Sequence, residues 1–428
     1  MSTLRDAMPR VAIAHDYLNQ RGGAERVVLA MAQAFPDASI HTTLYDPAGT
    51  YPEFASRRVV VSPLNRIAWL RRHHRVALLL LPLAAQVVRP RAQVVLISSS
   101  GFAHGFRSEG HRLVYCHAPA RWLYQPKEYL GLDRSPGAPE AGGAGGSVAS
   151  SWILRAALAV LRPSLTRWDR RAARSADRYL TNSRVVRDRV RAAYGIDAKV
   201  LAPPMTLDAA GDQMPVAALA DWADSGYHLV VSRVLPYKHV DRVVAAFSGM
   251  PSRRLVVVGD GPRAARLAAD LPGNVRLLRT LTDAQLRWVY AHSAALVAAS
   301  FEDFGLTPLE AGAFGKPTIA LGSGGYLDTV VPGVTGVFFP EPTAAAIAQG
   351  VEDAQRHTWS AEAIREHADR FSMAAFIDAI RAEVDDLLAS VGPAPFENGP
   401  AGAPEDAKVA GERPVLDVVK IKADAVLP

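Results

Sequence analysis

Short apolar runs of strand length alternate with helical patterns through the second half of this chain. Six runs lie between residues 228 and 339: His228–Ser232, Leu255–Gly259, Val275–Leu278, Ala294–Ala298, Pro317–Leu321 and Gly336–Phe339. Helical patterns separate them, for example Val240–Phe247, Arg263–Leu271 and Asp283–His292. Strands that alternate with helices predict a parallel sheet with helices covering both faces.

The first half repeats this rhythm, with strand candidates at Arg10–His15, Ser39–Leu44, Arg58–Val61, Val94–Ser98, Leu113–Cys116 and Tyr179–Thr181. A chain of 428 residues exceeds what one hydrophobic core usually organises. The sequence therefore predicts an α/β protein of two doubly wound, Rossmann-like domains, at residues 9–205 and 225–370. They join near Pro203–Gly226, and the amphipathic pattern at 371–390 predicts one further helix.

Two segments are too poor in large apolar side chains to offset the entropy of ordering them. Residues 135–150 consist almost entirely of Gly, Ala, Pro and Ser, and residues 391–414 have the same character. We expect a flexible insertion in the first domain and a largely disordered tail over residues 391–428.

The single cysteine, Cys116, excludes an intrachain disulfide framework and a cysteine-based zinc site. It lies in an apolar run, which predicts a buried thiol. The first ten residues lack the apolar region of a signal peptide. We therefore expect a cytoplasmic protein.

Arginine is concentrated in two segments of the first half. Residues 54–108 contain nine arginines and no Asp or Glu, and residues 152–174 contain six arginines and one acid, Asp169. Basic side chains beside apolar ones suit the anionic face of a membrane. Buried helices with solvated arginine edges explain the pattern equally well, so both interpretations stay open. A nucleic-acid partner is not expected, because neither segment interleaves aromatic residues or carries a known module.

Candidate ligand-binding residues follow the first-domain strands, where open parallel sheets bind their ligands. Gly22 and Gly23 precede a helix, and a glycine turn there allows a phosphate to approach the backbone. An ordinary strand-to-helix turn explains the same pair. His117 follows the run Leu113–Cys116 and precedes an Arg-aromatic pair, Arg121-Trp122, so we expect it in a cleft. His15 and Asp16 are weaker candidates for the same cleft.

Arg233 and Lys238 follow the first strand of the second domain, on a loop stiffened by Pro236. Two cations at this position suit a diphosphate, which arginine binds as a fork and lysine as a point charge. Gly259 lies in a similar strand-turn-helix segment. It either lets the backbone turn tightly beside a nucleotide or serves the turn alone.

The segment from Glu302 to Glu310 carries the strongest signal. It follows a predicted strand and opens a helix, so Phe304, Gly305, Leu306 and Thr307 would present backbone amides to an anion at the helix N-terminus. Glu310 would lie one turn into that helix, where a carboxylate can accept paired hydroxyl hydrogen bonds. Glu302 would face another part of the same ligand.

The spacing of Glu302 and Glu310 resembles the E-x7-E motif of the retaining glycosyltransferases of family 4, which have the GT-B fold. The block from His15 to Arg26 and the block from Cys116 to Tyr124 resemble the mannosyltransferase branch that assembles bacterial surface polysaccharides, O-antigen included. The resemblance extends from the first strand to about residue 389.

The resemblance implies a role for each matching position. Gly23 would pack against the donor diphosphate, which Arg233 and Lys238 would neutralise. Glu310 would bind ribose hydroxyls, and Glu302 and His117 would contact the donor sugar. It further implies retention of configuration, no metal and no cofactor, and transfer of a hexose, with mannose from GDP-mannose favoured, to a lipid-linked or glycan acceptor.

Three alternatives remain from the sequence. A UDP-sugar could be the donor. A nucleotide-sugar 2-epimerase shares the fold, although no clear set of acid and base carboxylates appears in the first domain. A non-catalytic protein that binds a nucleotide sugar would conserve the donor site without transfer.

Overall fold

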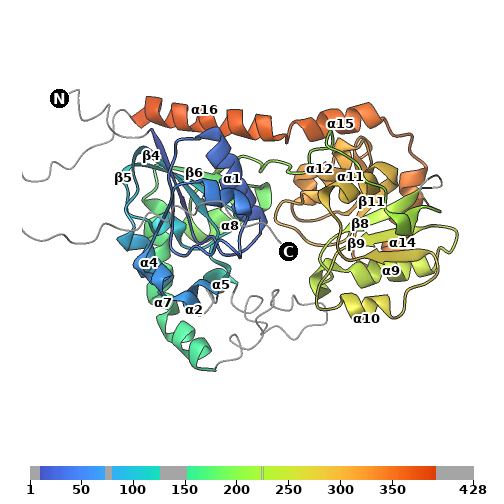
Figure 1. Cartoon of the computed structure of the whole chain (residues 1–428), viewed down its shortest axis with the longest axis horizontal. Helices are drawn as coiled ribbons and strands as arrows, with labels where there is room; N and C mark the ends of the chain where they lie inside the picture. Colours follow the sequence, from blue (N-terminus) through green and yellow to red (C-terminus); the bar gives the residue numbers. More distant parts are fainter. Residues whose placement is uncertain (1–9, 73–79, 126–151, 223, 225, 392–428) are drawn as a thin grey trace, which may run out of the picture. The chain divides into compact units, whose positions relative to one another are not determined.

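The computed structural model describes residues 10–72, 80–125, 152–222, 224 and 226–391 (Figure 1). The predicted insertion at 135–150 and the predicted tail after Val391 lie outside the described residues. Two parallel sheets form the framework, which confirms the predicted α/β class with two Rossmann-like domains.

The first sheet has seven strands in the order β3-β2-β1-β4-β5-β6-β7, and every pairing in it is parallel. Its strands are β1 (Val11–His15), β2 (Ile40–Thr42), β3 (Val59–Val61), β4 (Arg91–Ser99), β5 (Glu109–Cys116), β6 (Arg178–Thr181) and β7 (Lys199–Val200). Six of these match the predicted runs. The strand β7 was missed because two residues carry no periodic signal.

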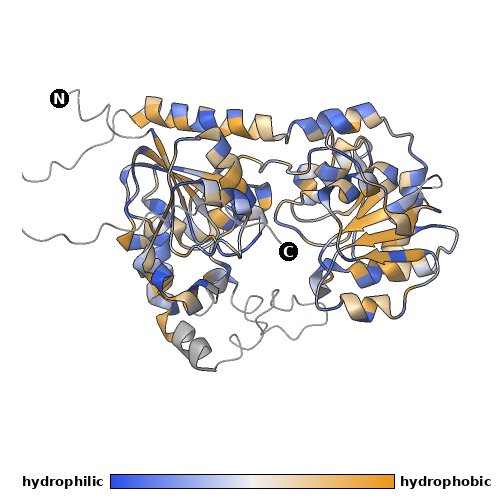
Figure 2. Ribbon diagram, in the orientation of Figure 1, coloured by the Kyte–Doolittle hydropathy of each residue, from blue (hydrophilic) through white to orange (hydrophobic). Residues whose placement is uncertain are grey.

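The second sheet has six parallel strands in the order β10-β9-β8-β11-β12-β13. They are β8 (Tyr227–Val231), β9 (Leu255–Val258), β10 (Val275–Leu278), β11 (Ser293–Ala298), β12 (Thr318–Leu321) and β13 (Gly336–Phe339). All six match predicted runs within one or two residues. Figure 2 shows these strands as a hydrophobic layer, as expected for a sheet buried on both faces.

Helices flank both sheets. Those of the first half are α1 (Gly23–Ala34), α2 (Ala68–Arg72), α4 (Leu81–Val87), α5 (Arg121–Tyr124), α7 (Trp152–Arg174) and α8 (Arg184–Tyr194). Those of the second half are α9 (Val240–Ser248), α10 (Ala264–Ala268), α11 (Asp283–His292), α12 (Thr307–Ala313), α13 (Tyr326–Thr329), α14 (Ala344–Gln355), α15 (Ala361–Asp369) and α16 (Met373–Val391). Single 3-10 turns are η1 (Pro52–Ser56), η2 (Pro63–Arg66), η3 (Ala103–Gly105), η4 (Ala217–Leu219) and η5 (Pro236–Lys238).

Alternate residues of the first sheet enter two separate cores, because successive strand side chains point to opposite faces. On β1, Ile13 joins the core under α1, whereas Ala12 and Ala14 join the core under α4, α7 and α8. The helix α16 contacts α1, and its buried Phe376 and Ile380 extend the first of these cores. Residues 371–391 therefore pack on the first sheet although they follow the second in sequence.

The strand order reverses once in each sheet, between β1 and β4 and between β8 and β11. At such a point the chain leaves neighbouring strands in opposite directions, so a crevice opens beyond their carboxyl ends. The residues at these ends are His15 and Ser99 in the first sheet and Val231 and Ala298 in the second. The predicted ligand-binding residues follow these four strands or their neighbour β5, except Gly259, which follows β9.

Candidate active site

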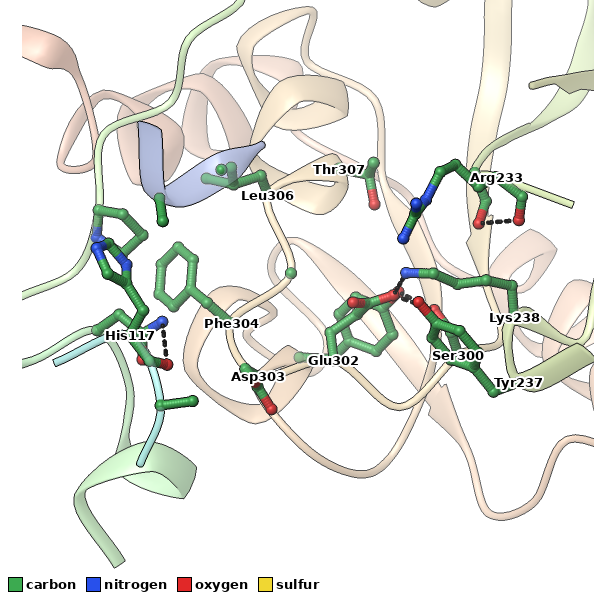
Figure 3. A pocket seen from close by; sticks show the side chains of 18 of the residues that line it. His117, Arg233, Tyr237, Lys238, Ser300, Glu302, Asp303, Phe304, Leu306 and Thr307 are labelled. Carbon is green, nitrogen blue, oxygen red and sulfur yellow. Dashed lines mark hydrogen bonds and ion pairs between the residues drawn. The ribbon is translucent and has the colours of Figure 1, made fainter. Parts of the chain in front are cut away.

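A pocket of about 580 Å³ lies at the carboxyl ends of the two sheets, lined by residues that follow β1, β4, β5, β8 and β11. Nine of the thirteen predicted site residues line it: Gly23, His117, Arg233, Lys238, Glu302, Phe304, Gly305, Leu306 and Thr307. Figure 3 shows Arg233 and Lys238 on one side of the pocket and His117 on the other, with Glu302 and Phe304 between them.

Lys238 and Glu302 form the central ion pair of the pocket. Lys238 ends the 3-10 turn η5 and is 14% exposed; Glu302 follows β11 and is 24% exposed. The carboxylate of Glu302 also accepts a hydrogen bond from the hydroxyl of Ser300, at 2.5 Å between the oxygens. This hydroxyl lies 3.0 Å from the hydroxyl of Tyr326. The partners hold Glu302 in one orientation at the pocket wall.

Arg233 is exposed and lines the pocket beside this ion pair. Its loop approaches the next strand closely. A side chain at Gly259, where φ is +157°, would collide with the backbone oxygen of Ser232. Gly259 does not line the pocket. The structure therefore explains Gly259 by backbone packing under the loop that carries Arg233, the second of its two sequence interpretations.

Two glycines of the pocket differ in what requires them. Gly305 has a φ of +85°, and a Cβ there would lie 2.6 Å from the ring of Tyr326, so the turn itself needs glycine. Gly23 starts α1, and an added Cβ would meet nothing within 4 Å. The protein thus leaves open space above the backbone of Gly23, which a ligand can approach. Its neighbour Gly22 precedes α1 outside the lining.

Glu310 lies in the first turn of α12 and accepts a hydrogen bond from the hydroxyl of Tyr290, at 2.8 Å. Burial raises the pKa of Glu310 above its usual range, although the bond from Tyr290 opposes the shift. The ring of Tyr290 stacks on Phe314. Glu310 is half-buried and does not line the pocket, and the hydrogen bond from Tyr290 fixes its carboxylate.

Asp16 is 1% exposed and does not line the pocket. Its carboxylate accepts hydrogen bonds from the backbone amides of Ser100, Phe102 and Ala103, with nitrogen–oxygen distances of 2.5, 2.8 and 2.7 Å. Since Ser100 and Phe102 line the pocket, Asp16 shapes the wall from behind. The sequence placed Asp16 at the correct strand end but assigned it to the ligand.

His117 is half-buried at the end of β5 and is held at both its ring and its backbone. Its Nε2 lies 2.8 Å from the hydroxyl of Ser98, and its carbonyl accepts a hydrogen bond from the amide of Asn182. Burial lowers the pKa of His117 to about 3, and the charge of His15 adds to that shift. His117 is therefore neutral at physiological pH.

Three arginines of the first half reach acids of the second half near the pocket. Arg121 and Arg189 both pair with Asp303, the residue after Glu302, and Arg184 pairs with Asp328. The nitrogen–oxygen distance from Arg189 to Asp303 is 2.6 Å. Sequence reasoning missed Asp303, and it missed Asn182 and Ser300, which line the pocket. Asn182 directly follows β6 and Ser300 comes two residues after β11, and that position was the available signal.

Other expectations concern the surroundings of the site. Cys116 is buried as predicted, and burial raises the pKa of its thiol. In the ranges that the structure describes, no group of three or more His, Cys, Asp or Glu side chains is arranged to hold a metal ion. Within the same ranges, no helix combines the length and apolar character needed to cross a membrane.

Two protein families match consecutive parts of the chain. Residues 21–204 match "Glycosyltransferase Family 4", and residues 222–371 match "Glycosyl transferases group 1". Together these ranges include both sheets from α1 onward and every residue that lines the pocket except Tyr17.

Curated relatives match about half of the chain in sequence, whereas solved structures match most of it in fold. A GDP-mannose-dependent alpha-mannosyltransferase of Mycobacterium tuberculosis is 32% identical over 216 residues, which are 45% of this chain and 53% of the relative. A D-inositol 3-phosphate glycosyltransferase of Mycobacteroides abscessus is 28% identical over 224 residues, 48% of this chain and 51% of the relative. The chain thus spans about half the length of these curated relatives.

The crystal structure of Anabaena Alr3699/HepE in complex with UDP-glucose superimposes with a TM-score of 0.59 at 18% identity, covering 88% of this chain and 99% of that one. At this identity the likeness concerns the fold.

Proposed function

We propose that this chain is a GT-B glycosyltransferase of family 4 that transfers a hexosyl group from a nucleotide-sugar donor to a lipid-linked or glycan acceptor. One observation carries the proposal. The cations Arg233 and Lys238 meet Glu302 on one side of a pocket whose other side presents neutral His117. A diphosphate leaving group needs the side that carries the cations, and an uncharged sugar suits the side that carries His117.

The pocket cations would stabilise the departing nucleoside diphosphate. When the bond between the anomeric carbon and the phosphate oxygen breaks, its electron pair stays on the diphosphate and the sugar becomes oxocarbenium-like. Arg233 and Lys238 face the space where that negative charge grows, and fixed charges cost no reorganisation at that moment. Open space above the backbone of Gly23 leaves room for the diphosphate.

Glu302 would orient the donor sugar and stabilise its developing positive charge, while the fixed carboxylate of Glu310 would bind ribose hydroxyls. The acceptor hydroxyl would attack from the face that the diphosphate leaves and pass its proton to a phosphate oxygen. This route retains configuration and needs no protein nucleophile and no metal. We expect turnover to persist in excess chelator.

Mannose from GDP-mannose is the donor we favour, in the synthesis of a cell-surface polysaccharide or glycolipid. The support is similarity to GDP-mannose-dependent relatives from Mycobacterium tuberculosis and Corynebacterium glutamicum. The UDP-glucose in the Anabaena structure supports the alternative of a UDP-sugar. A nucleotide that binds the folded protein raises its Tm, so comparing GDP, UDP and ADP by thermal shift identifies the base.

Turnover then tests the reaction itself. The purified chain is incubated with GDP-mannose, UDP-glucose and UDP-galactose, each with and without a polyprenyl-linked acceptor, and product configuration is determined by NMR. We expect acceptor-dependent transfer with retention. Inversion would contradict the mechanism, donor conversion without acceptor would identify an epimerase, and binding without turnover would identify a non-catalytic protein.

We further propose that the first half rests on an anionic membrane at its cytoplasmic face, where a lipid-linked acceptor would be available. Exposed apolar side chains gather on α2, α4 and α7 and just before them, including Leu83 at 63% and Val160 at 77% exposure. Both α4 and α7 contact η3, so they lie close together. A groove beside them on α7 is lined by Arg167, Arg170, Arg171 and Arg174. Apolar and cationic groups together suit anionic lipid.

Vesicle sedimentation tests this surface. The full chain should bind vesicles containing phosphatidylglycerol and should bind phosphatidylcholine vesicles much less. Charge reversal at Arg167 and Arg171 should abolish the difference, whereas Arg242→Glu with Arg266→Glu, an equal change in the second half, should preserve it. Equal loss in both double variants would show a general charge effect and would contradict a dedicated surface.

A further inference from the structure

A line of four polar side chains runs from the pocket wall into the first sheet. It begins at His117, continues through Ser98 on β4 and His15 on β1, and ends at Glu25 in the first turn of α1. Ser98 is fully buried, and His15 and Glu25 are each 1% exposed. His15 and Ser98 are direct neighbours across the parallel strands. Of the four, only His117 lines the pocket.

Distances fix where the protons of His15 lie. Its Nδ1 is 3.0 Å from the backbone carbonyl oxygen of Ser98, which can only accept, so Nδ1 carries a hydrogen. Its Nε2 is 3.7 Å from a carboxylate oxygen of Glu25. Burial alone would lower the pKa of His15, but Glu25, Asp16 and the carbonyl of Ser98 together outweigh burial, and the pKa lies above its ordinary value. Burial would likewise raise the pKa of Glu25, yet His15 and Gln20 together hold it below its ordinary value. The two form a buried histidine–carboxylate pair.

The hydroxyl of Ser98 lies between His15 and His117 and determines which nitrogen of His117 carries hydrogen. Its Oγ lies 3.0 Å from Nδ1 of His15, whose single hydrogen is donated to the carbonyl of Ser98, so Oγ can at most share that hydrogen and cannot donate to Nδ1. The hydroxyl hydrogen remains, and Nε2 of His117 lies 2.8 Å away. Within the part of the chain that the structure describes, no other acceptor is recorded for this hydroxyl. A buried hydroxyl left without an acceptor would cost free energy, so Ser98 donates and Nε2 of His117 accepts.

We propose that Glu25, His15 and Ser98 are positioning residues that hold His117 in a single neutral tautomer, with its Nδ1–H available to the pocket as a hydrogen-bond donor. The ligand atom that this donor recognises is an uncharged acceptor such as a hydroxyl oxygen. That this oxygen belongs to the donor sugar rests on the proposed function. A neutral donor also avoids placing a cation beside the positive charge that develops on the sugar.

The tautomer can be observed directly without any assay of sugar transfer. The full chain is labelled with 15N-histidine, and long-range proton–nitrogen correlation spectra at pH 7 show which ring nitrogen carries hydrogen. Loss of one signal set in His117→Gln assigns His117. We expect hydrogen on Nδ1 of His117 and on Nδ1 of His15. Hydrogen on Nε2 of His117, or a protonated His117 ring, would overturn the proposal even if transfer is confirmed.

Substitution of Ser98 tests the relay itself. In Ser98→Ala, His117 should show a mixture of tautomers, and kcat should fall by about fivefold to tenfold with little change in KM for the donor. Ser98→Thr keeps the hydroxyl and should restore both. Ser99→Ala is the matched control, because the neighbouring hydroxyl of Ser99 lies 3.2 Å from His104. Should Ser98→Ala fold and keep the Nδ1–H tautomer, the relay would be refuted; if it fails to fold, the wild-type spectrum still decides.

Discussion

The two sheets contribute opposite kinds of side chain to the pocket. The second sheet supplies Arg233, Lys238 and Glu302, charged groups that reach the pocket surface, where Lys238 and Glu302 pair with each other. The first sheet keeps its ionisable groups behind the surface, where Asp16, His15 and Glu25 are almost wholly buried; Asp16 accepts hydrogen bonds from backbone amides, and His15 faces Glu25 on α1. Only neutral His117 emerges from that network.

This difference matches the chemistry that we propose for each side. A departing diphosphate needs cations that stabilise its negative charge, whereas an uncharged sugar needs neutral hydrogen-bonding groups in fixed positions. Buried networks provide such fixity because breaking them leaves unpaired polar groups in a medium of low dielectric constant. The predictions below separate the two sides, since charge on the second should control activity and burial on the first should control stability.

The largest effect should come from the cations of the second sheet. We expect Arg233→Ala and Lys238→Ala each to lower kcat/KM by about 10²-fold to 10³-fold, the usual cost of removing one preorganised electrostatic group. Arg279→Ala is the control, because Arg279 is an exposed cation of the same half that pairs with Asp260 away from the pocket. Full activity in Lys238→Ala would disprove the diphosphate assignment.

On the first sheet, Asp16→Ala should mainly reduce stability. It removes the acceptor for three backbone amides, those of Ser100, Phe102 and Ala103. Each buried donor without a partner costs about 1–3 kcal/mol, so the free energy of unfolding should fall by at least about 3 kcal/mol. Urea denaturation measures the loss, and Asp37→Ala on the exposed surface should change stability by less than about 0.5 kcal/mol. An unchanged unfolding midpoint for Asp16→Ala would show that the network is dispensable.

Stability should also fall with pH below about 6.5. Burial lowers the pKa of His41 and of His228 to about 4 and that of His117 to about 3. In the unfolded chain these groups titrate near 6.5, so the unfolded state takes up protons first as the pH falls. Their contribution is complete above pH 6.5 and is lost progressively towards pH 4.

The difference between about 6.5 and about 4 corresponds to about 3 kcal/mol for each of His41 and His228, so the sum for the three histidines is on the order of 10 kcal/mol. His15 acts in the opposite sense, because its raised pKa makes its contribution complete below pH 6.5 and lost as the pH rises through its folded-state pKa. Urea unfolding between pH 7.5 and 4.5 measures the net change. In His228→Gln the free energy of unfolding should depend less strongly on pH, because the contribution of His228, on the second sheet, is removed. Stability that rises on acidification would contradict the assignment.

The smallest effect should come from the contact between the two sides. Arg189→Ala removes one of the two arginines that pair with Asp303, and Arg121 remains. We expect about a twofold to fivefold fall in kcat/KM, since a partly exposed ion pair contributes up to about 1 kcal/mol. Arg187→Ala on the same helix is the matched control, because Arg187 pairs with its neighbour Asp188. Equal effects of the two variants would remove any special role for Asp303.

Local sequence patterns determined most of the secondary structure of this protein. All the predicted strands occur, because apolar runs of four to six residues bounded by turn residues are strand signals in themselves. Helices were also recognised, with less accurate ends: α10 covers Ala264–Ala268 where Arg263–Leu271 was predicted. The rule that ligands bind beyond the carboxyl ends of parallel strands brought His117, Arg233, Lys238 and Glu302 to one site in advance.

Only the tertiary structure determined which residues distant in sequence contact each other. His15 and Ser98 are 83 positions apart, and their contact exists because β1 lies between β2 and β4 and pairs with both. The same pairing gives Asp16 three amide partners and makes it a structural residue. A local pattern encodes the type of an element and its polarity, but the partner of a buried polar group is set by packing between distant segments. The sequence alone therefore predicted nine residues that line the pocket, while the fold determined that Asp16, Gly22, Gly259 and Glu310 lie outside its lining.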